Sequence, residues 1–208
     1  MCHGFVYDGV YSPYRRRLHG NSCTGINGEQ FVVALQTHDQ VANASRGQRL
    51  STFVSFEDQR VAAAVLLCAP YIPLLFMGQE YGETAPFHYF TSHQDCGLAE
   101  AVREGRRREF SGFGSGFADP QASETFLASK IDWRRRDREP HRSVLRCYRE
   151  LLALRRRHPA LAHPRKDMAD VTYDESNHTL TLERWGPAGD RVTLRVDFAA
   201  GSFDFSSS

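Results

Sequence analysis

The chain lacks the features that mark membrane and secreted proteins. No run approaches the roughly 18 consecutive apolar residues of a transmembrane helix, and no basic segment followed by an apolar one opens the sequence. The five cysteines are widely spaced and include no Cys-x-x-Cys pair, so neither a zinc site nor a disulfide framework is indicated. We therefore expect a cytoplasmic protein that needs no metal or other cofactor.

An excess of charge of one sign is also missing. With 26 basic and 25 acidic residues, the formal net charge is +1, which gives no bulk attraction to nucleic acid or to anionic membranes. Arginine clusters occur at residues 15–17, 106–108, 134–136 and 155–157, and acidic residues flank several of them. We interpret these clusters as solvated faces and ion pairs rather than as a nucleic-acid surface.

What the chain does contain is enough apolar sequence for a globular core, at 41% of 208 residues. Its organising stretch runs from Phe31 to Asn43. Residues 31–35 form a short apolar run rich in β-formers, which predicts a strand buried on both faces of a parallel sheet. Polar side chains follow at once: Gln36, Thr37, His38, Asp39, Gln40 and Asn43.

The position of these polar residues points to Asp39 as the first functional candidate. In parallel α/β folds, ligands and chemistry lie at the carboxyl ends of the strands. The same residue types also cap helices and shape turns, so a purely structural interpretation stays open.

A helix and a second strand follow this stretch. Residues 56–69 carry apolar side chains at helical spacing, and residues 72–77 form a second short apolar run. Strand, helix and strand predict a right-handed βαβ unit with parallel strands. The carboxyl ends of both strands then share one edge, which places Asp39, Glu80 and Glu83 on one rim.

The other segments are predicted from their periods and turn signals. Residues 1–30 predict a long loop, and residues 98–110 a charged helix that residues 113–116 end. Residues 85–95 predict an aromatic loop, whose rings either bind sugar or pack onto the fold. A longer helix begins near Pro140 and ends at His158.

The period changes near residue 160. Residues 171–173, 179–185 and 191–198 alternate apolar and polar side chains, which predicts an antiparallel meander. We therefore divide the chain into residues 1–160 and an incomplete β domain over residues 161–208. The tail from residue 201 onward has little to hold it, and we expect it to fray.

Several of these stretches together resemble the α-amylase family, glycoside hydrolase family 13. A strand followed by Gln36–Gln40, a helix, and the run Ile72–Gly82 is similar to the last two βα units of that family's barrel. The resemblance implies an α/β fold, the C-terminal part of a (β/α)8 TIM barrel followed by a small antiparallel β domain.

Further stretches are similar to one branch of that family, the malto-oligosyltrehalose trehalohydrolases; they are Phe5–Gly9, His38–Asn43, Pro86–His93, Glu100–Phe110 and Ser129–Trp133. The resemblance runs over residues 4–185. It implies hydrolysis of the α-1,4-glucosidic bond next to a terminal trehalose unit, in trehalose biosynthesis. The substrate would be a malto-oligosaccharide or trehalose-capped maltodextrin.

The resemblance also implies roles for the residues of the rim. Family members flank the scissile bond with a nucleophile and a general acid/base about 5 Å apart, and a third carboxylate stabilises the transition state. Asp39 matches this third carboxylate, while His38, Gln40, Asn43 and Glu80 match substrate-binding positions. No segment here matches the strands that carry the nucleophile and acid/base, so we expect the chain alone to be inactive.

Two residues differ from the family pattern, and two other functions stay open. Thr37 stands where the family has Asn, and Gln79 where it commonly has Glu. A glycogen-branching transferase shares the His-Asp loop, and a non-catalytic carbohydrate-binding module would use only the aromatic rim. Because two parallel strands leave apolar edges uncovered, we expect an upstream barrel fragment or a second copy as a partner.

Overall fold

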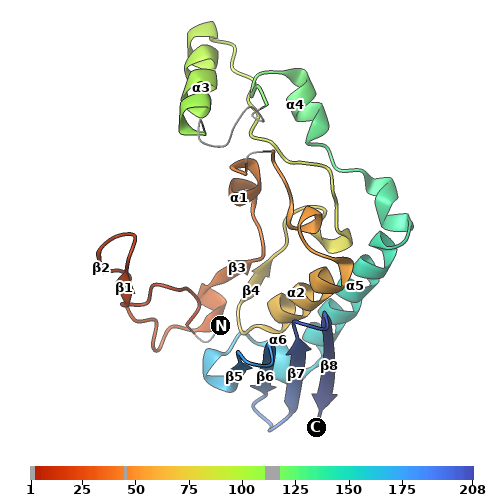
Figure 1. Cartoon of the computed structure of the whole chain (residues 1–208). Coiled ribbons are helices and arrows are strands. Elements are labelled where there is room, and N and C mark those ends of the chain that lie inside the picture. Colours follow the sequence, from red (N-terminus) through yellow and green to blue (C-terminus); the bar gives the residue numbers. More distant parts are fainter. Residues whose placement is uncertain (1–2, 45, 111–117) are drawn as a thin grey trace. The chain divides into compact units, whose positions relative to one another are not determined.

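Two short parallel strands lie where the apolar runs predict them. In the computed structural model, which describes residues 3–44, 46–110 and 118–208, β3 spans Val32–Ala34 and β4 spans Ile72–Leu74. They pair in parallel, with Val32 opposite Ile72, and α2 (Phe56–Cys68) connects them along the chain (Figure 1). The predicted order of strand, helix and strand, with parallel pairing, is confirmed; the right-handed crossover stays a prediction.

The two strands are not buried on both faces, and this part of the prediction is wrong. The exposed fractions of Val32, Ile72 and Leu74 are 62%, 41% and 39%. Within the described ranges, β3 and β4 form a two-stranded sheet with no further neighbour. A strand in the middle of a parallel sheet has a strand on each side and helices on its faces. Here that cover is incomplete, which leaves apolar side chains in water.

The chain folds as two compact units, each built from separate stretches of sequence. The first comprises residues 1–34, 60–74 and 146–208, and the second comprises residues 35–59 and 75–145. The first unit therefore contains β3, β4 and the C-terminal sheet, whereas the second contains the polar segments that follow each strand. The domain boundary near residue 160 stays a prediction.

The C-terminal sheet of the first unit is a four-stranded antiparallel meander. Its strands are β5 (Ala169–Asp174), β6 (Thr179–Trp185), β7 (Arg191–Asp197) and β8 (Ser202–Ser207), in that order. Leu182 and Leu194 are fully buried. The tail does not fray, contrary to our expectation, because β8 pairs along β7. Phe203 and Phe205 alternate with polar residues and contact each other with ring centroids 5.6 Å apart.

Two arginines bind the carboxyl end of α2 within the first unit. Arg155, on α5 (His141–Arg157), donates to three backbone carbonyls, those of Leu67, Ala69 and Tyr71. Arg184 on β6 donates to the carbonyls of Cys68 and His163, at 2.8 and 2.7 Å. Burial, with the nearby Arg155 charge, lowers the pKa of Arg184 to about 10. The cations satisfy carbonyls that a helix end leaves without partners.

The other described strands are β1 (Tyr11–Ser12) and β2 (Arg17–Leu18), which pair with each other. The other described α-helices are α1 (His38–Ala42), α3 (Cys96–Glu109), α4 (Ser123–Ala128) and α6 (Pro159–Ala162). The loop predicted over residues 1–30 thus contains a small hairpin. The predicted break at residues 113–116 lies outside the described residues. Every described helix is too short or too polar to cross a membrane.

The exposed strand pair generates the first testable prediction. We expect the isolated chain to self-associate, because the apolar side chains of β3 and β4 have too little cover. Replacing the facing pair Val32→Thr and Ile72→Thr keeps β-branched residues but adds a hydroxyl, and should shift the chain toward monomer in sedimentation velocity. Val6→Thr, at a residue that is 80% exposed outside these strands, is the control. A monomeric unmodified chain would contradict the prediction.

Candidate functional site

A five-residue helix, α1, follows β3 and carries four of the five predicted site residues at or next to it. Thr37 is its N-cap residue, and the Thr37 N–H donates to the side-chain oxygen of Gln40 at 2.9 Å. This contact satisfies a backbone donor at the start of the helix. The capping interpretation of these polar residues therefore holds for Thr37 and Gln40. His38 and Asp39 remain exposed to solvent.

Asp39 is held by a chain of polar contacts inside the second unit. The side-chain N–H of Asn43 donates to Asp39 Oδ1 at 2.9 Å, one helical turn away. Asn43 Oδ1 in turn accepts from Arg106 Nη1 at 2.8 Å. Both polar atoms of the Asn43 amide are thus engaged by protein groups. The substrate-binding role implied for Asn43 stays a prediction, and the structure adds a link from Asp39 to Arg106.

Arg106 departs from the sequence interpretation of its cluster. Its side chain is only 11% exposed, whereas the neighbouring Arg107 and Arg108 are 65% and 75% exposed and pair with Glu104. The interpretation as solvated, ion-paired side chains therefore holds for Arg107 and Arg108; Arg106 has an ion-pair partner, Glu109, but is largely covered rather than solvated. A signal was available, since Arg106 lies seven residues after Ala99 and four before Phe110, and both of these are buried.

Glu80 lies in a tight turn after β4. The turn is a 3-10 helix, Gln79–Tyr81, between Gly78 and Gly82, whose φ angles are +85° and +68°. A Cβ on Gly78 would lie 2.7 Å from Glu83 Cβ, so a larger residue does not fit there. Glycine is thus required both by conformation and by space. Glu80 itself is half-buried, and its predicted contact with substrate stays a prediction.

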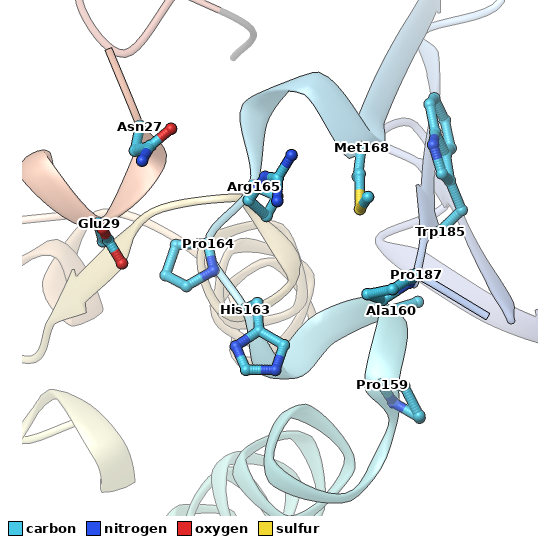
Figure 2. A pocket seen from close by; sticks show the side chains of 10 residues that line it. All are labelled: Asn27, Glu29, Pro159, Ala160, His163, Pro164, Arg165, Met168, Trp185 and Pro187. Carbon is cyan, nitrogen blue, oxygen red and sulfur yellow. The ribbon is translucent and has the colours of Figure 1, made fainter. Parts of the chain in front are cut away.

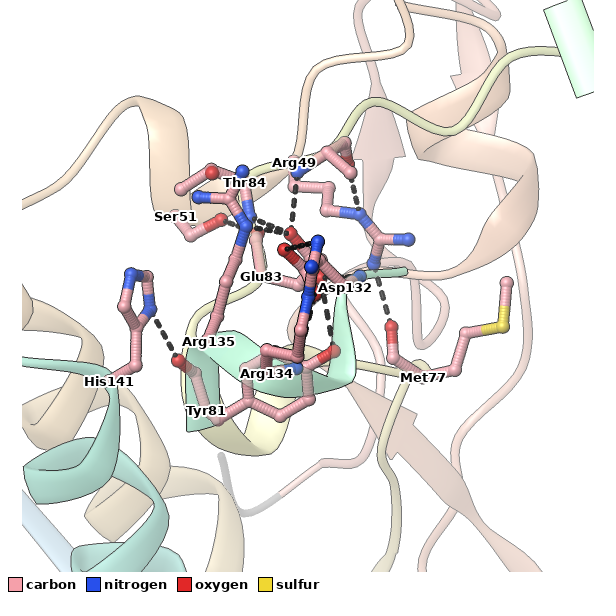
Figure 3. A network of polar contacts seen from close by, with 11 residues as sticks. Arg49, Ser51, Met77, Tyr81, Glu83, Thr84, Asp132, Arg134, Arg135 and His141 are labelled. Atoms are coloured by element: carbon pink, nitrogen blue, oxygen red, sulfur yellow. Dashed lines mark hydrogen bonds and ion pairs between the residues drawn. The ribbon is translucent and has the colours of Figure 1, made fainter. Parts of the chain in front are cut away.

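Glu83 does not face solvent at the predicted rim, because its side chain is fully buried. Its carboxylate accepts hydrogen bonds from the backbone N–H groups of Thr84, Ala85 and Asp132 at 2.8, 2.8 and 2.7 Å, and from the Tyr81 hydroxyl at 3.0 Å (Figure 3). Arg135 Nε lies 3.2 Å from Oε1. Glu83 therefore joins the turn after β4 to the segment at residue 132. Burial and the adjacent Glu83 carboxylate raise the pKa of Tyr81, so its hydroxyl stays a donor.

Arg49 provides a second buried charge beside this turn. It donates to the carbonyls of Met77 and Ala85, each at 2.7 Å, and its guanidinium lies 4.8 Å from the centre of the Phe76 ring. Burial lowers the pKa of Arg49, while the charge of Glu83 acts in the opposite direction. The residue stays a cation near neutral pH, since an arginine pKa begins so high. Nothing in its sequence context indicated this role.

The aromatic loop packs mainly onto the fold. Phe87 contacts the rings of Phe76 and Phe90, and Phe90 contacts Phe126, with ring centroids 5.2, 5.7 and 5.2 Å apart. These rings contact one another edge to face. Tyr89 is 37% exposed and lies with the Arg106 guanidinium 4.4 Å from its ring centre, and Phe126 is 45% exposed. Tyr89 and Phe126 are therefore the more accessible of these rings.

A separate cavity of about 370 Å³ lies in the first unit (Figure 2). Trp185, Met168, Glu29 and Arg165 are among its lining residues, and none of the predicted site residues lines it. Over the part of the chain that the structure describes, no group of three or more His, Cys, Asp or Glu residues could hold a metal ion. The candidate site is therefore the Asp39 segment of the second unit.

Comparison with known proteins shows what the chain is similar to. No family model matches the chain. A malto-oligosyltrehalose trehalohydrolase from Saccharolobus solfataricus is 41% identical over 179 residues, which are 86% of this chain and 29% of that protein. One from Brevibacterium helvolum is 40% identical over 210 residues, 95% of this chain and 35% of that protein. The chain is related to malto-oligosyltrehalose trehalohydrolases over about a third of their length.

A solved structure agrees with this relation. The crystal structure of a Salmonella typhimurium protein described as an alpha amylase superposes with a TM-score of 0.83 at 38% identity, over 94% of this chain and 34% of that one. The resemblance to the trehalohydrolase branch, drawn from residues such as His38–Asn43, is confirmed. The roles of the individual site residues stay predictions.

Glu83 allows a test of how the second unit is held together. Replacing it by Gln removes the charge opposite Arg135 and leaves one amide N–H₂ facing backbone donors. We expect the free energy of unfolding to fall by about 2 kcal/mol. The measurement is a urea titration followed by Trp133 fluorescence in a Trp185→Phe background. The control, Glu104→Gln on the exposed face of α3, should change it by less than about 0.5 kcal/mol; an equal loss in both variants would contradict the role of Glu83.

Proposed function

We propose that this chain is the C-terminal portion of a malto-oligosyltrehalose trehalohydrolase, the part that supplies a transition-state-stabilising carboxylate, Asp39. The enzyme would hydrolyse the α-1,4-glucosidic bond next to a terminal trehalose unit and release trehalose. The observation that carries the proposal is the identity of about 40% with enzymes of that name over nearly the whole chain. That identity extends through the helix that bears Asp39.

The chemistry of Asp39 supports the proposed role. Glycoside cleavage passes through a transition state with positive charge on the sugar ring, and an ionised carboxylate stabilises that charge. Asp39 is exposed at the start of α1, and Asn43 binds one of its oxygens. The adjacent His38 is exposed as well, which suits a contact with a ring hydroxyl. Glu80 and Gln40 complete the proposed contacts with a trehalose-capped maltodextrin.

The proposal assigns the nucleophile and the general acid/base to residues outside this chain. It also assigns β3 and β4 to the last two βα units of a (β/α)8 barrel. The exposure of Val32 and Ile72 supports this assignment, because barrel neighbours would cover such side chains. The partner would be an upstream barrel fragment. The free thiols of Cys23, Cys68, Cys96 and Cys147 are in keeping with a reducing compartment such as the cytoplasm.

The first consequence is that the chain alone should not turn over substrate. Purified chain at high concentration, given malto-oligosyltrehalose, is expected to release no trehalose above the uncatalysed rate, because bond cleavage needs a nucleophile and an acid. Trehalose is quantified by chromatography. Clear turnover that Asp39→Asn abolishes would show that the chain carries a complete site.

The second consequence concerns Asp39 in a complete enzyme. In a chimera, this chain replaces the matching third of the Brevibacterium helvolum relative. We expect trehalose release, and a loss in kcat of about 100-fold or more for Asp39→Asn, which keeps the size but loses the charge that faces the transition state. Asp137→Asn, at an exposed carboxylate, should leave kcat within about twofold.

The product distinguishes the enzyme classes. Branched glucan in place of trehalose would support a transferase, and an unchanged kcat for Asp39→Asn would remove Asp39 from the mechanism.

A further inference from the structure

We infer that Arg106 is a positioning residue: by selecting the orientation of the Asn43 amide, it fixes the carboxylate of Asp39. This inference rests on the proposed function of Asp39. All three residues lie in the second unit, on α1 and α3. In this proposal, Arg106 acts through Asn43 rather than on the substrate.

An asparagine side-chain amide can face either of two ways. The oxygen and the N–H₂ group of an asparagine side chain are nearly equal in size, so their surroundings decide which way the amide faces. A guanidinium only donates, and an ionised carboxylate only accepts. Asn43 lies between the two, with Oδ1 2.8 Å from Arg106 Nη1 and Nδ2 2.9 Å from Asp39 Oδ1.

The opposite orientation would be doubly unfavourable. It would set the N–H₂ group of Asn43 against the donors of Arg106, and the amide oxygen against the carboxylate of Asp39. The Arg106 cation therefore selects the orientation in which the N–H₂ group of Asn43 donates to Asp39. Without Arg106, a bond between exposed side chains four residues apart on a helix contributes only about 0.2–0.5 kcal/mol, too little to hold a carboxylate in one place.

Arg106 is itself held from several sides, as a positioning residue must be. Its guanidinium lies 4.4 Å from the ring centres of both Tyr89 and Phe110, and Nη2 donates to the carbonyl of Ala42 at 3.2 Å. Glu109 lies 3.6 Å away on the same helix. Two nitrogens of one planar group thus contact the last turn of α1. An ordered guanidinium gives its partner a defined direction, which a flexible surface arginine does not.

The experiment is a double-mutant cycle in the chimera that releases trehalose. Arg106→Met keeps an unbranched side chain between the two rings but removes every donor, and Asn43→Ala removes the link. We expect each single variant to lower kcat about tenfold, because the lost contact acts on the transition state, and Arg106→Met to leave KM for the malto-oligosyltrehalose within about twofold. The double variant should lose no more than either single variant. Arg107→Met, one position along α3 and exposed, should leave both constants unchanged.

The conservative variant separates positioning from packing. Arg106→Lys restores one charged donor and should recover part of the lost kcat; it also takes the place of Arg106→Met in the cycle if the Met variant does not fold. Losses that multiply to about 100-fold in the double variant would overturn the inference, since Arg106 would then act independently of Asn43. An unchanged kcat in Arg106→Met would overturn it as well. If the chimera with the unmodified chain is inactive, both the proposed function and the positioning role are overturned. If that chimera is active but the losses in kcat of the two single variants multiply in the double variant, only the positioning role is overturned.

Discussion

The buried carboxylate of Glu83 is the interaction on which the second unit depends. A charge without solvent is costly unless every lone pair has a partner, and Glu83 meets this condition with three backbone N–H groups, a tyrosine hydroxyl and Arg135. Because those donors belong to the turn after β4 and to the segment at residue 132, the carboxylate fixes loops that have little regular secondary structure. Arg49 extends the same arrangement to the carbonyls of Met77 and Ala85. Polar contacts therefore help to hold this unit in shape, together with apolar burial.

Much of the local structure followed from periodicity. The βαβ unit, the charged helix α3 and the meander over β5 to β7 agree with the spacing of apolar side chains, which repeats every 3.6 residues in a helix and every 2 in a strand. This spacing reflects which side of an element is covered. The tail was misjudged for a related reason. Phe203 and Phe205 do alternate with polar residues, but the tail from residue 201 onward was expected to have little to hold it. Pairing with β7 stabilises β8 as a strand, although the local sequence alone does not favour one.

The buried charges show where sequence reasoning ends. The position of Glu83 after a strand pointed to a rim, yet whether a carboxylate faces solvent or backbone donors depends on segments about 50 residues away in the chain. Arg106 and Arg107 are adjacent and chemically identical; the spacing from Ala99 and Phe110 indicates which of them is covered, but not that its partners are Tyr89, Asn43 and Ala42. The prediction that β3 is buried on both faces was wrong because burial, too, depends on distant segments. The apolar run identifies a strand that can be buried, and its neighbours decide whether it is.

The contacts that hold α1 also set the position of Asp39, the residue of the proposed function. A five-residue helix is far too short to be stable alone, so α1 depends on the burial of Val41 and Ala42 and on contacts at its two ends. Gln40 holds its first turn, and Arg106 holds its last. Arg106 lies on α3 and packs against Tyr89, and both belong to the stretches, Pro86–His93 and Glu100–Phe110, that resemble the trehalohydrolase branch rather than the wider α-amylase family. The residues that carry the resemblance to the branch thus support the helix that carries Asp39. Under the proposed function, a supporting segment of this kind would set where the carboxylate lies without altering the carboxylate itself, which is how one barrel architecture serves many reactions.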